Sequence, residues 1–246
     1  MTDRPFSGNN DPVVTNEDTR RGTEALPSGA LHEIPGSRLN GPKGRPDTLA
    51  IGVWVWLASE LMFFAALFAA YFMLRNTTNE IAAQTGEPAM WATESAHLDI
   101  VFASINTSIL VLSSLTMQFA ANAASAGRVE GSWINPMKMG LRQGVILSTI
   151  LGSVFLSGQI WEYFTLFSEG FNIGTNQYWS AFFLATGFHG LHVFGGIVAM
   201  LIVLARSYMT RTHTNEQTVH THVVSYYWHF VDVIWIVLFA IIYFLR

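Results

Sequence analysis

Five long apolar stretches dominate the pattern of hydrophobic and polar positions, and short polar loops separate them. They are residues 50–74, 100–124, 143–167, 179–205 and 221–245. A helix of about 25 residues is about 37 Å long, which exceeds the roughly 30 Å hydrocarbon core of a bilayer. Membrane-spanning β-strands would be shorter and would alternate in polarity, which these stretches do not. Because backbone polar groups in lipid must be paired within the segment, the pattern predicts five transmembrane helices in an all-α bundle.

The first 48 residues have a different composition. They hold six of the eight prolines and six glycines, and they contain no apolar run. Such a segment buries too little apolar surface to offset the entropy lost on ordering. We therefore expect a flexible, disordered N-terminal tail over 1–48, with a partner-docking arm as the alternative, followed by a transmembrane domain over 49–246. The early charges are not followed by the apolar run of a signal peptide.

The positive charges alternate along the chain. Eleven of the 13 Lys and Arg residues fall in the tail and around the second and fourth loops. The first loop has only Arg75, the third has none, and the chain ends at Arg246. By the positive-inside rule, this asymmetry predicts a cytoplasmic N-terminus and a C-terminus outside the cell.

The overall composition supports a membrane protein. Hydrophobic residues make up 50% of the chain and charged residues only 12%, whereas soluble domains carry about 25% charged residues. This excludes an ordinary soluble enzyme and a nucleic-acid binder with a basic face. The absence of cysteine excludes disulfides, thiol catalysis, iron–sulfur clusters and Cys-type zinc sites.

Glu60 is the most conspicuous polar residue, because it is the single charged residue of the first predicted helix and lies near its middle. A carboxylate at the bilayer centre costs about 2.5–3.5 kcal/mol on insertion scales. We therefore expect Glu60 to face the bundle interior and to be protonated or hydrogen-bonded. It is a candidate proton, lipid or ligand site, and the alternative is a hydrogen bond that fixes helix packing.

Three further pairs of polar residues lie three positions apart, which places each pair on one helix face. The pairs are Gln159 with Glu162, His189 with His192, and His229 with Asp232.

We expect Gln159 and Glu162 to anchor helix packing, with an ion entry point as the alternative. For the two histidines we favour hydrogen bonding within the bundle over metal binding. For His229 and Asp232 we expect a mutual pair or a contact with another helix, with a proton relay as the alternative. Small residues beside the histidines would allow close helix approach; these are Gly187, Gly190, Gly195 and Gly196.

Four segments resemble motifs of subunit III of haem–copper terminal oxidases in its five-helix bacterial form. They are Trp56–Phe64 (WLASELMFF), Gly158–Tyr163 (GQIWEY), Phe182–Gly196 (FFLATGFHGLHVFGG) and Tyr227–Trp235 (YWHFVDVIW). They occur in the order and spacing of that family. The resemblance covers residues 50 to 246, or about four-fifths of the chain.

This resemblance implies a non-redox accessory subunit of an oxygen-reducing, proton-pumping cytochrome c oxidase in a bacterial cell membrane. In that family haem and copper are bound by subunits I and II. Subunit III packs mainly against subunit I, carries bound phospholipid and helps to sustain proton uptake. Glu60 matches the family's buried first-motif carboxylate, and its other in-membrane polar positions are matched by Glu162, His189, His192, His229 and Asp232. The resemblance gives these residues structural or regulatory roles and implies no catalytic residue, metal or redox cofactor on this chain.

The resemblance has one clear departure and leaves alternatives open. The chain lacks the first two helices of seven-helix members, so the lipid cleft of those members would need a wall from another subunit, such as subunit I. Subunit III of a quinol oxidase and the homologue associated with nitric oxide reductase are close alternatives. A small proton-coupled transporter is an alternative of another class, although the chain shows no internal repeat.

Overall fold

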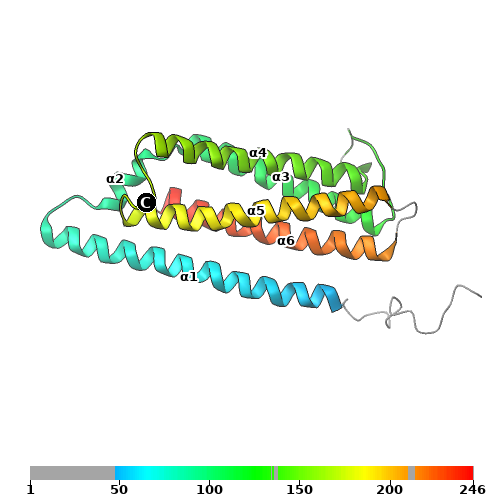
Figure 1. Ribbon diagram of the computed structural model, residues 1–246, viewed down its shortest axis with the longest axis horizontal. Coiled ribbons are helices and arrows are strands. Elements are labelled where there is room, and N and C mark those ends of the chain that lie inside the picture. The colour runs from blue at the N-terminus through cyan, green and yellow to red at the C-terminus, as the bar shows by residue number, and fades with distance from the viewer. Residues whose placement is uncertain (1–47, 134, 136–137, 210–213, 246) are drawn as a thin grey trace, which may run out of the picture. The chain divides into compact units, whose positions relative to one another are not determined.

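The computed structural model describes residues 48–133, 135, 138–209 and 214–245, and within them five helices are long and apolar enough to cross a membrane (Figure 1). They are α1 (Thr48–Thr85), α3 (Ile100–Ser125), α4 (Leu141–Ser168), α5 (Gln177–Met209) and α6 (Asn215–Phe239), which continues as the π-helical η5 (Ala240–Phe244). This confirms the predicted all-α transmembrane bundle. The predicted N-terminal tail lies, up to residue 47, outside the described residues, as do Arg211 and Arg246.

The helix ends follow local sequence signals. The Oδ1 atom of Asp99 accepts hydrogen bonds from the backbone N–H groups of Val101 at 2.9 Å and Phe102 at 3.1 Å, which caps α3. Gly127 follows the end of α3 with a φ of 66°. Only glycine adopts this left-handed conformation without steric cost, so Gly127 allows the chain to reverse there.

α1 is longer than the pattern predicts, because it continues from residue 74 to Thr85. Its 38 residues correspond to about 57 Å, well beyond the thickness of a hydrocarbon core. The polar residues after Arg75 interrupt the apolar pattern but contain no helix breaker before Gly86, whose φ is 76°. The last turns of α1 are therefore helical without being part of an apolar span.

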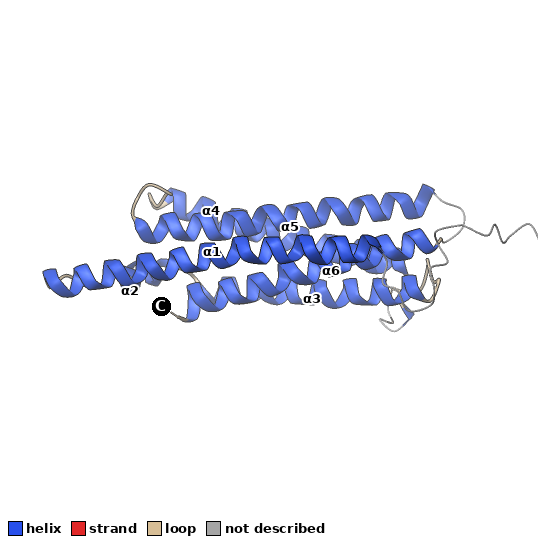
Figure 2. Ribbon diagram, turned by 90° about the horizontal axis from the view of Figure 1, so that it is seen from below, coloured by secondary structure: helices blue, strands red, loops and turns tan. Residues whose placement is uncertain are grey.

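Helices α3, α4, α5 and α6 pack in sequence, and α3 also contacts α6. α1 lies along α5 and α6, at the lower edge of the bundle in Figure 1. Figure 2, turned by 90°, shows all five helices running nearly along one direction. The largest fully buried side chains of the core are aromatic; they include Trp179, Trp228, Trp235, Phe155 and Phe64.

Close packing of α5 on α6 centres on Trp228. A Cβ placed on Gly196 would lie 2.7 Å from Cε3 of Trp228, which is shorter than carbon atoms tolerate. A Cβ placed on Gly152 of α4 would lie equally close to the same indole, 2.7 Å from Cη2 of Trp228. At Gly187, Gly190 and Gly195 a Cβ would meet its nearest neighbour at ordinary contact distances of 3.4–3.9 Å. Of the four predicted packing glycines, Gly196 is thus the one where the Trp228 indole leaves no space for a larger side chain.

Two short helices, α2 (Met90–Glu94) and η3 (Ser95–His97), were not predicted. They lie where α1 ends and α3 begins, and we call this end of the bundle the α2 end (Figure 1). Buried Trp91 packs edge-on against Tyr71 of α1 and Tyr178 of α5, with ring centroids 4.6 and 5.1 Å apart. The carboxylate of Glu94 accepts hydrogen bonds from Trp179 Nε1 and Asn176 Nδ2, both at 2.8 Å. These contacts attach the connection between α1 and α3 to α5.

Candidate functional site: polar residues inside the bundle

Glu60 contacts His192, so the structure brings together residues from the first and third motifs. The Oε2 atom of Glu60 in α1 lies 3.2 Å from Nε2 of His192 in α5. Both side chains are largely covered, with 22% and 16% exposed. The pair therefore joins α1 to α5 within the spans.

The hydrogen bonds of His192 indicate how hydrogens are arranged in this pair. The Nδ1 atom of His192 lies 2.7 Å from the backbone oxygen of Phe188. A carbonyl oxygen can only accept, so Nδ1 carries a hydrogen. One shared proton then lies between Nε2 and Oε2, giving either a neutral acid with a neutral imidazole or a carboxylate with an imidazolium. In both states the pair has zero net charge, which lowers its cost in a membrane.

Aromatic side chains surround the Glu60–His192 pair. The indole of Trp56 stacks on the ring of Tyr227, with centroids 5.3 Å apart and planes 6° from parallel. The hydroxyl of Tyr227 donates to the backbone oxygen of His192 at 2.9 Å. Phe64, which is fully buried, meets the His192 ring edge-on at 5.0 Å. The first, third and fourth motifs therefore converge on one contact among α1, α5 and α6.

His189 has entirely different partners from His192, although the two are three residues apart. Its ring is fully buried and lies against the Trp235 ring, with centroids 4.7 Å apart and planes tilted by 33°. Its Nε2 atom lies 3.2 Å from the backbone oxygen of Val231 in α6, so Nε2 carries the hydrogen. The Nδ1 atom is buried and has no hydrogen-bond partner among the described residues. His189 therefore links α5 to α6, whereas His192 links α5 to α1.

Glu162 is the single carboxyl group of α4, and its side chain is buried. Gln159 Nε2 donates to one of its oxygens at 3.1 Å, and the hydroxyl of Tyr243 donates to the other at 2.7 Å. The prediction that Gln159 and Glu162 share a face is confirmed by this direct bond. Tyr243 lies in η5, 81 residues further along the chain. Residue spacing within α4 therefore could not predict it as a partner of Glu162.

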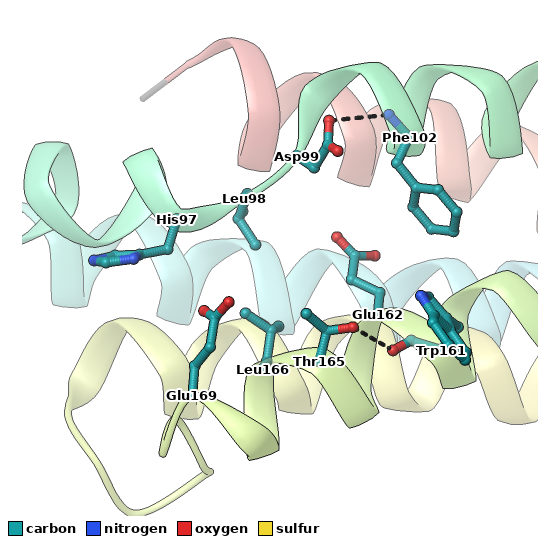
Figure 3. A pocket seen from close by; sticks show the side chains of 9 residues that line it. All are labelled: His97, Leu98, Asp99, Phe102, Trp161, Glu162, Thr165, Leu166 and Glu169. Carbon is teal, nitrogen blue, oxygen red and sulfur yellow. Dashed lines mark hydrogen bonds between the residues drawn. The ribbon is translucent and has the colours of Figure 1, made fainter.

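A cavity of about 160 Å³ opens beside Glu162 at the α2 end (Figure 3). Its lining includes His97, Asp99, Trp161 and Glu169. Figure 3 shows Glu162 and Glu169 rising from the α4 segment toward the start of α3, where Asp99 caps the helix. The cavity is thus acidic and lies at a helix end.

His229 and Asp232 do not bond to one another. The Nε2 atom of His229 lies 3.1 Å from Oε1 of Gln118 in α3. Asp232 lies beside Ser114 of α3, but neither its Oδ1 atom nor the Ser114 hydroxyl has a hydrogen-bond partner among the described residues. Of the two predicted arrangements, contact with another helix is the one observed. Gln118, an exposed polar residue on α3, supplies this contact for His229.

No group of three or more His, Asp or Glu side chains in the described part of the chain is arranged to hold a metal ion. Each of Glu60, Glu162, His189, His192 and His229 instead takes part in a hydrogen bond to another residue of the bundle.

A family model described as cytochrome c oxidase subunit III matches residues 43–246. The chain belongs to the cytochrome c oxidase subunit III family. A relative from Nocardia farcinica, named probable cytochrome c oxidase subunit 3, is 42% identical over 202 residues, which cover 82% of this chain and 90% of the relative. The cytochrome c oxidase subunit 3 of Corynebacterium diphtheriae is also 42% identical, with the same coverage. That of Thermostichus vulcanus is 36% identical over 81% of this chain and 89% of its own length.

The predicted family is therefore confirmed, and these relatives carry the predicted name. None of the three favours the quinol oxidase, nitric oxide reductase or transporter alternatives. With five helices able to span a membrane, this member of the subunit III family is a multi-pass membrane protein.

Proposed function

We propose that the chain is a non-redox accessory subunit of a proton-pumping cytochrome c oxidase in a bacterial cell membrane. In this proposal it packs mainly against subunit I, also contacts subunit II, and supports the stability and proton uptake of subunit I. Haem and copper are held by those partner subunits. Family membership over residues 43–246 is the observation that carries this proposal.

The contacts of the in-membrane polar residues support an accessory role. The Glu60–His192 contact holds α1 on α5 at 3.2 Å, and the Tyr243–Glu162 bond holds the end of α6 and η5 on α4 at 2.7 Å. Hydrogen bonds of this kind connect helices in a membrane, where they contribute about 0.6 kcal/mol on average. We therefore assign to Glu60, Gln159, Glu162, His189, His192, His229 and Asp232 a structural or regulatory role rather than a catalytic one.

The charge pattern gives the proposed orientation. The end opposite the α2 end carries Arg128, Lys138, Arg142 and Arg206. At this end Arg142 contacts Glu130, donates to the backbone oxygen of Ser207 and lies over the Tyr208 ring. By the positive-inside rule we place this end in the cytoplasm and the α2 end outside. Phospholipid is proposed to contact the apolar outer faces of α4 and α5.

The direct test is affinity purification of the chain from its native membrane in mild detergent, followed by an optical spectrum and identification of the subunits. We expect a haem-bearing subunit and a copper-bearing subunit to co-purify. A copper-bearing subunit II would support cytochrome c as the electron donor over a quinol. Recovery of the chain alone, without haem, from membranes whose oxidase is otherwise intact would contradict the proposal.

A further inference from the structure

A groove of about 390 Å³ runs between α1 and α6 near the middle of the spans. Its α1 wall includes Trp54 and Leu61, and its α6 wall includes Tyr226, His229 and Val233. Most of the lining is apolar. One polar group in it is the imidazole of His229, which lies near the middle of α6. The groove is therefore an apolar surface with a polar group at mid-membrane depth.

The hydrogen bond between His229 and Gln118 shows which ring nitrogen of His229 carries the hydrogen and which can still accept a hydrogen bond. Gln118 Nε2 donates to Oδ1 of Asn122 at 3.1 Å, so the other end of the same amide is an oxygen. That oxygen lies 3.1 Å from Nε2 of His229, and therefore Nε2 carries the hydrogen. An imidazolium without a counter-charge is costly inside a membrane, so the ring is neutral. Its Nδ1 atom is then a hydrogen-bond acceptor, and no described residue donates to it.

Polar contacts continue along this side of the molecule, where α3 meets α6. Ser125 bonds His222 at 2.7 Å, Gln118 bonds His229 at 3.1 Å, and Asp232 lies beside Ser114. We call these six residues the α3–α6 seam. Polar side chains in transmembrane segments usually face protein or a water-filled cavity rather than lipid.

The outer face of α4 provides the contrast. Its large exposed side chains near the middle of the helix are aliphatic; they are Ile150, Val154 and Ile160. Lipid acyl chains can cover this aliphatic face of α4 without leaving a polar group unpaired. In the groove between α1 and α6, acyl chains would leave the Nδ1 atom of His229 without a hydrogen-bond donor, since hydrocarbon offers none.

We propose that the groove between α1 and α6 receives a transmembrane helix of another oxidase subunit, and that this helix offers a hydrogen-bond donor to His229. The chemistry that fits is an apolar helix with one serine, threonine, asparagine or glutamine side chain at mid-membrane depth. Helices in lipid associate through close packing and such isolated hydrogen bonds. The inference rests on the proposed function, because it requires the chain to be part of an oxidase complex.

The test uses the photo-crosslinking amino acid benzoylphenylalanine at Val233 and, as a matched control, at Val154. Both positions are valines in the middle of a helix, with 57% and 47% exposure, and Val233 lines the groove whereas Val154 lies on the outer face of α4. The tagged chain would be illuminated in native membranes and purified in its complex. We expect the Val233 variant to crosslink to a membrane subunit of the oxidase and the Val154 variant to carry lipid adducts alone.

The outcomes separate the two proposals. In one outcome the haem-bearing subunit co-purifies, but Val233 carries lipid adducts alone or Val154 crosslinks to a subunit. This result would overturn the groove assignment and leave the proposed function intact. Failure of any haem-bearing subunit to co-purify would overturn both.

A second variant pair tests the hydrogen bond itself. His229→Leu removes the acceptor, and we expect it to lower the fraction of the chain retained in the complex at rising detergent by several-fold. His229→Gln keeps an acceptor oxygen and should restore most of the retention. Equal loss in both variants, with the chain still present in the membrane, would contradict a hydrogen bond to the partner helix.

Discussion

α1 and α6 are both apolar spans, yet they are held in the bundle in different ways. Half of the most apolar 18-residue segment of α6 with η5 is buried, compared with 17% in α1. α6 packs against the long helices α3, α5 and α1, whereas α1 packs against α5, α6 and the short helix α2. The difference shows that α6 belongs to the core, and that α1 depends on a few localised contacts along one edge.

The localised contacts of α1 include the stack of Trp56 on Tyr227, the Glu60–His192 pair and the packing of Tyr71 on Trp91. The contacts of α6 include two buried indoles that donate to α3, Trp228 to Ser113 at 3.0 Å and Trp235 to Thr107 at 2.9 Å. Substitutions in α6 should therefore destabilise the whole bundle, and substitutions in α1 should mainly loosen that helix.

The largest expected effect comes from Trp228→Ala. Trp228 is fully buried and packs on Gly152 and Gly196. Its removal leaves a cavity and takes away the indole donor of the Ser113 hydroxyl, which should lower the free energy of unfolding by about 3–5 kcal/mol. Thermal unfolding of the purified protein in detergent measures this. Trp161→Ala is the matched control, because Trp161 is 69% exposed, and an equal effect in both variants would contradict the core assignment of α6.

Glu60→Lys should have the next largest effect. A lysine would place a cation opposite His192 with no counter-charge, at a cost of about 2.5–3.5 kcal/mol on insertion scales. We expect less inserted chain, or less of it bound in the complex, on immunoblots of membranes and of purified oxidase. Arg75→Lys, outside the apolar segment of α1, should leave both amounts unchanged. Wild-type levels of Glu60→Lys in the complex would show that Glu60 does not face the bundle.

Glu162→Leu should destabilise the bundle to a smaller extent. It leaves Tyr243 and Gln159 as buried donors without their acceptor, at about 1–3 kcal/mol for a buried unsatisfied group. Glu162→Gln keeps one acceptor oxygen and should lose less than half as much in the same thermal measurement. Indistinguishable stabilities of the two variants would contradict the two hydrogen bonds as the reason for this carboxyl group.

The smallest expected effect is the coupling between Glu60 and His192. A double-mutant cycle with Glu60→Ala and His192→Ala should give about 0.6 kcal/mol, and at most about 1.7 kcal/mol, as found for hydrogen bonds between membrane helices. Glu60→Gln should leave assembly and oxygen reduction intact. Loss of oxygen reduction in Glu60→Gln, with the complex assembled, would contradict a non-catalytic Glu60.

The sequence was sufficient to predict the five spans, because apolar length alone decides them. It also predicted that Gln159 and Glu162 share a face, and they bond directly. Spacing did not predict the partners of the histidines. Residues three apart in a helix differ by about 60° in direction, which is enough for His189 to reach α6 and His192 to reach α1. Which helix lies in each direction is a property of the packing.

The parts that could not be predicted share a physical reason. Tyr243 and Gln118 become partners of Glu162 and His229 only through contacts between distant helices. α2 has five residues, too few for a hydrophobic period, and its position depends on burial of Trp91. Local sequence carries no signal for such contacts.

The most direct test of the non-redox assignment is to strip this subunit from the purified oxidase with detergent and to measure haem and copper in both fractions. If the polar residues hold the bundle together rather than bind redox groups, all haem and copper should remain with the other subunits. The isolated chain should then show no Soret band. A stoichiometric Soret band or copper content in the isolated chain would contradict the assignment.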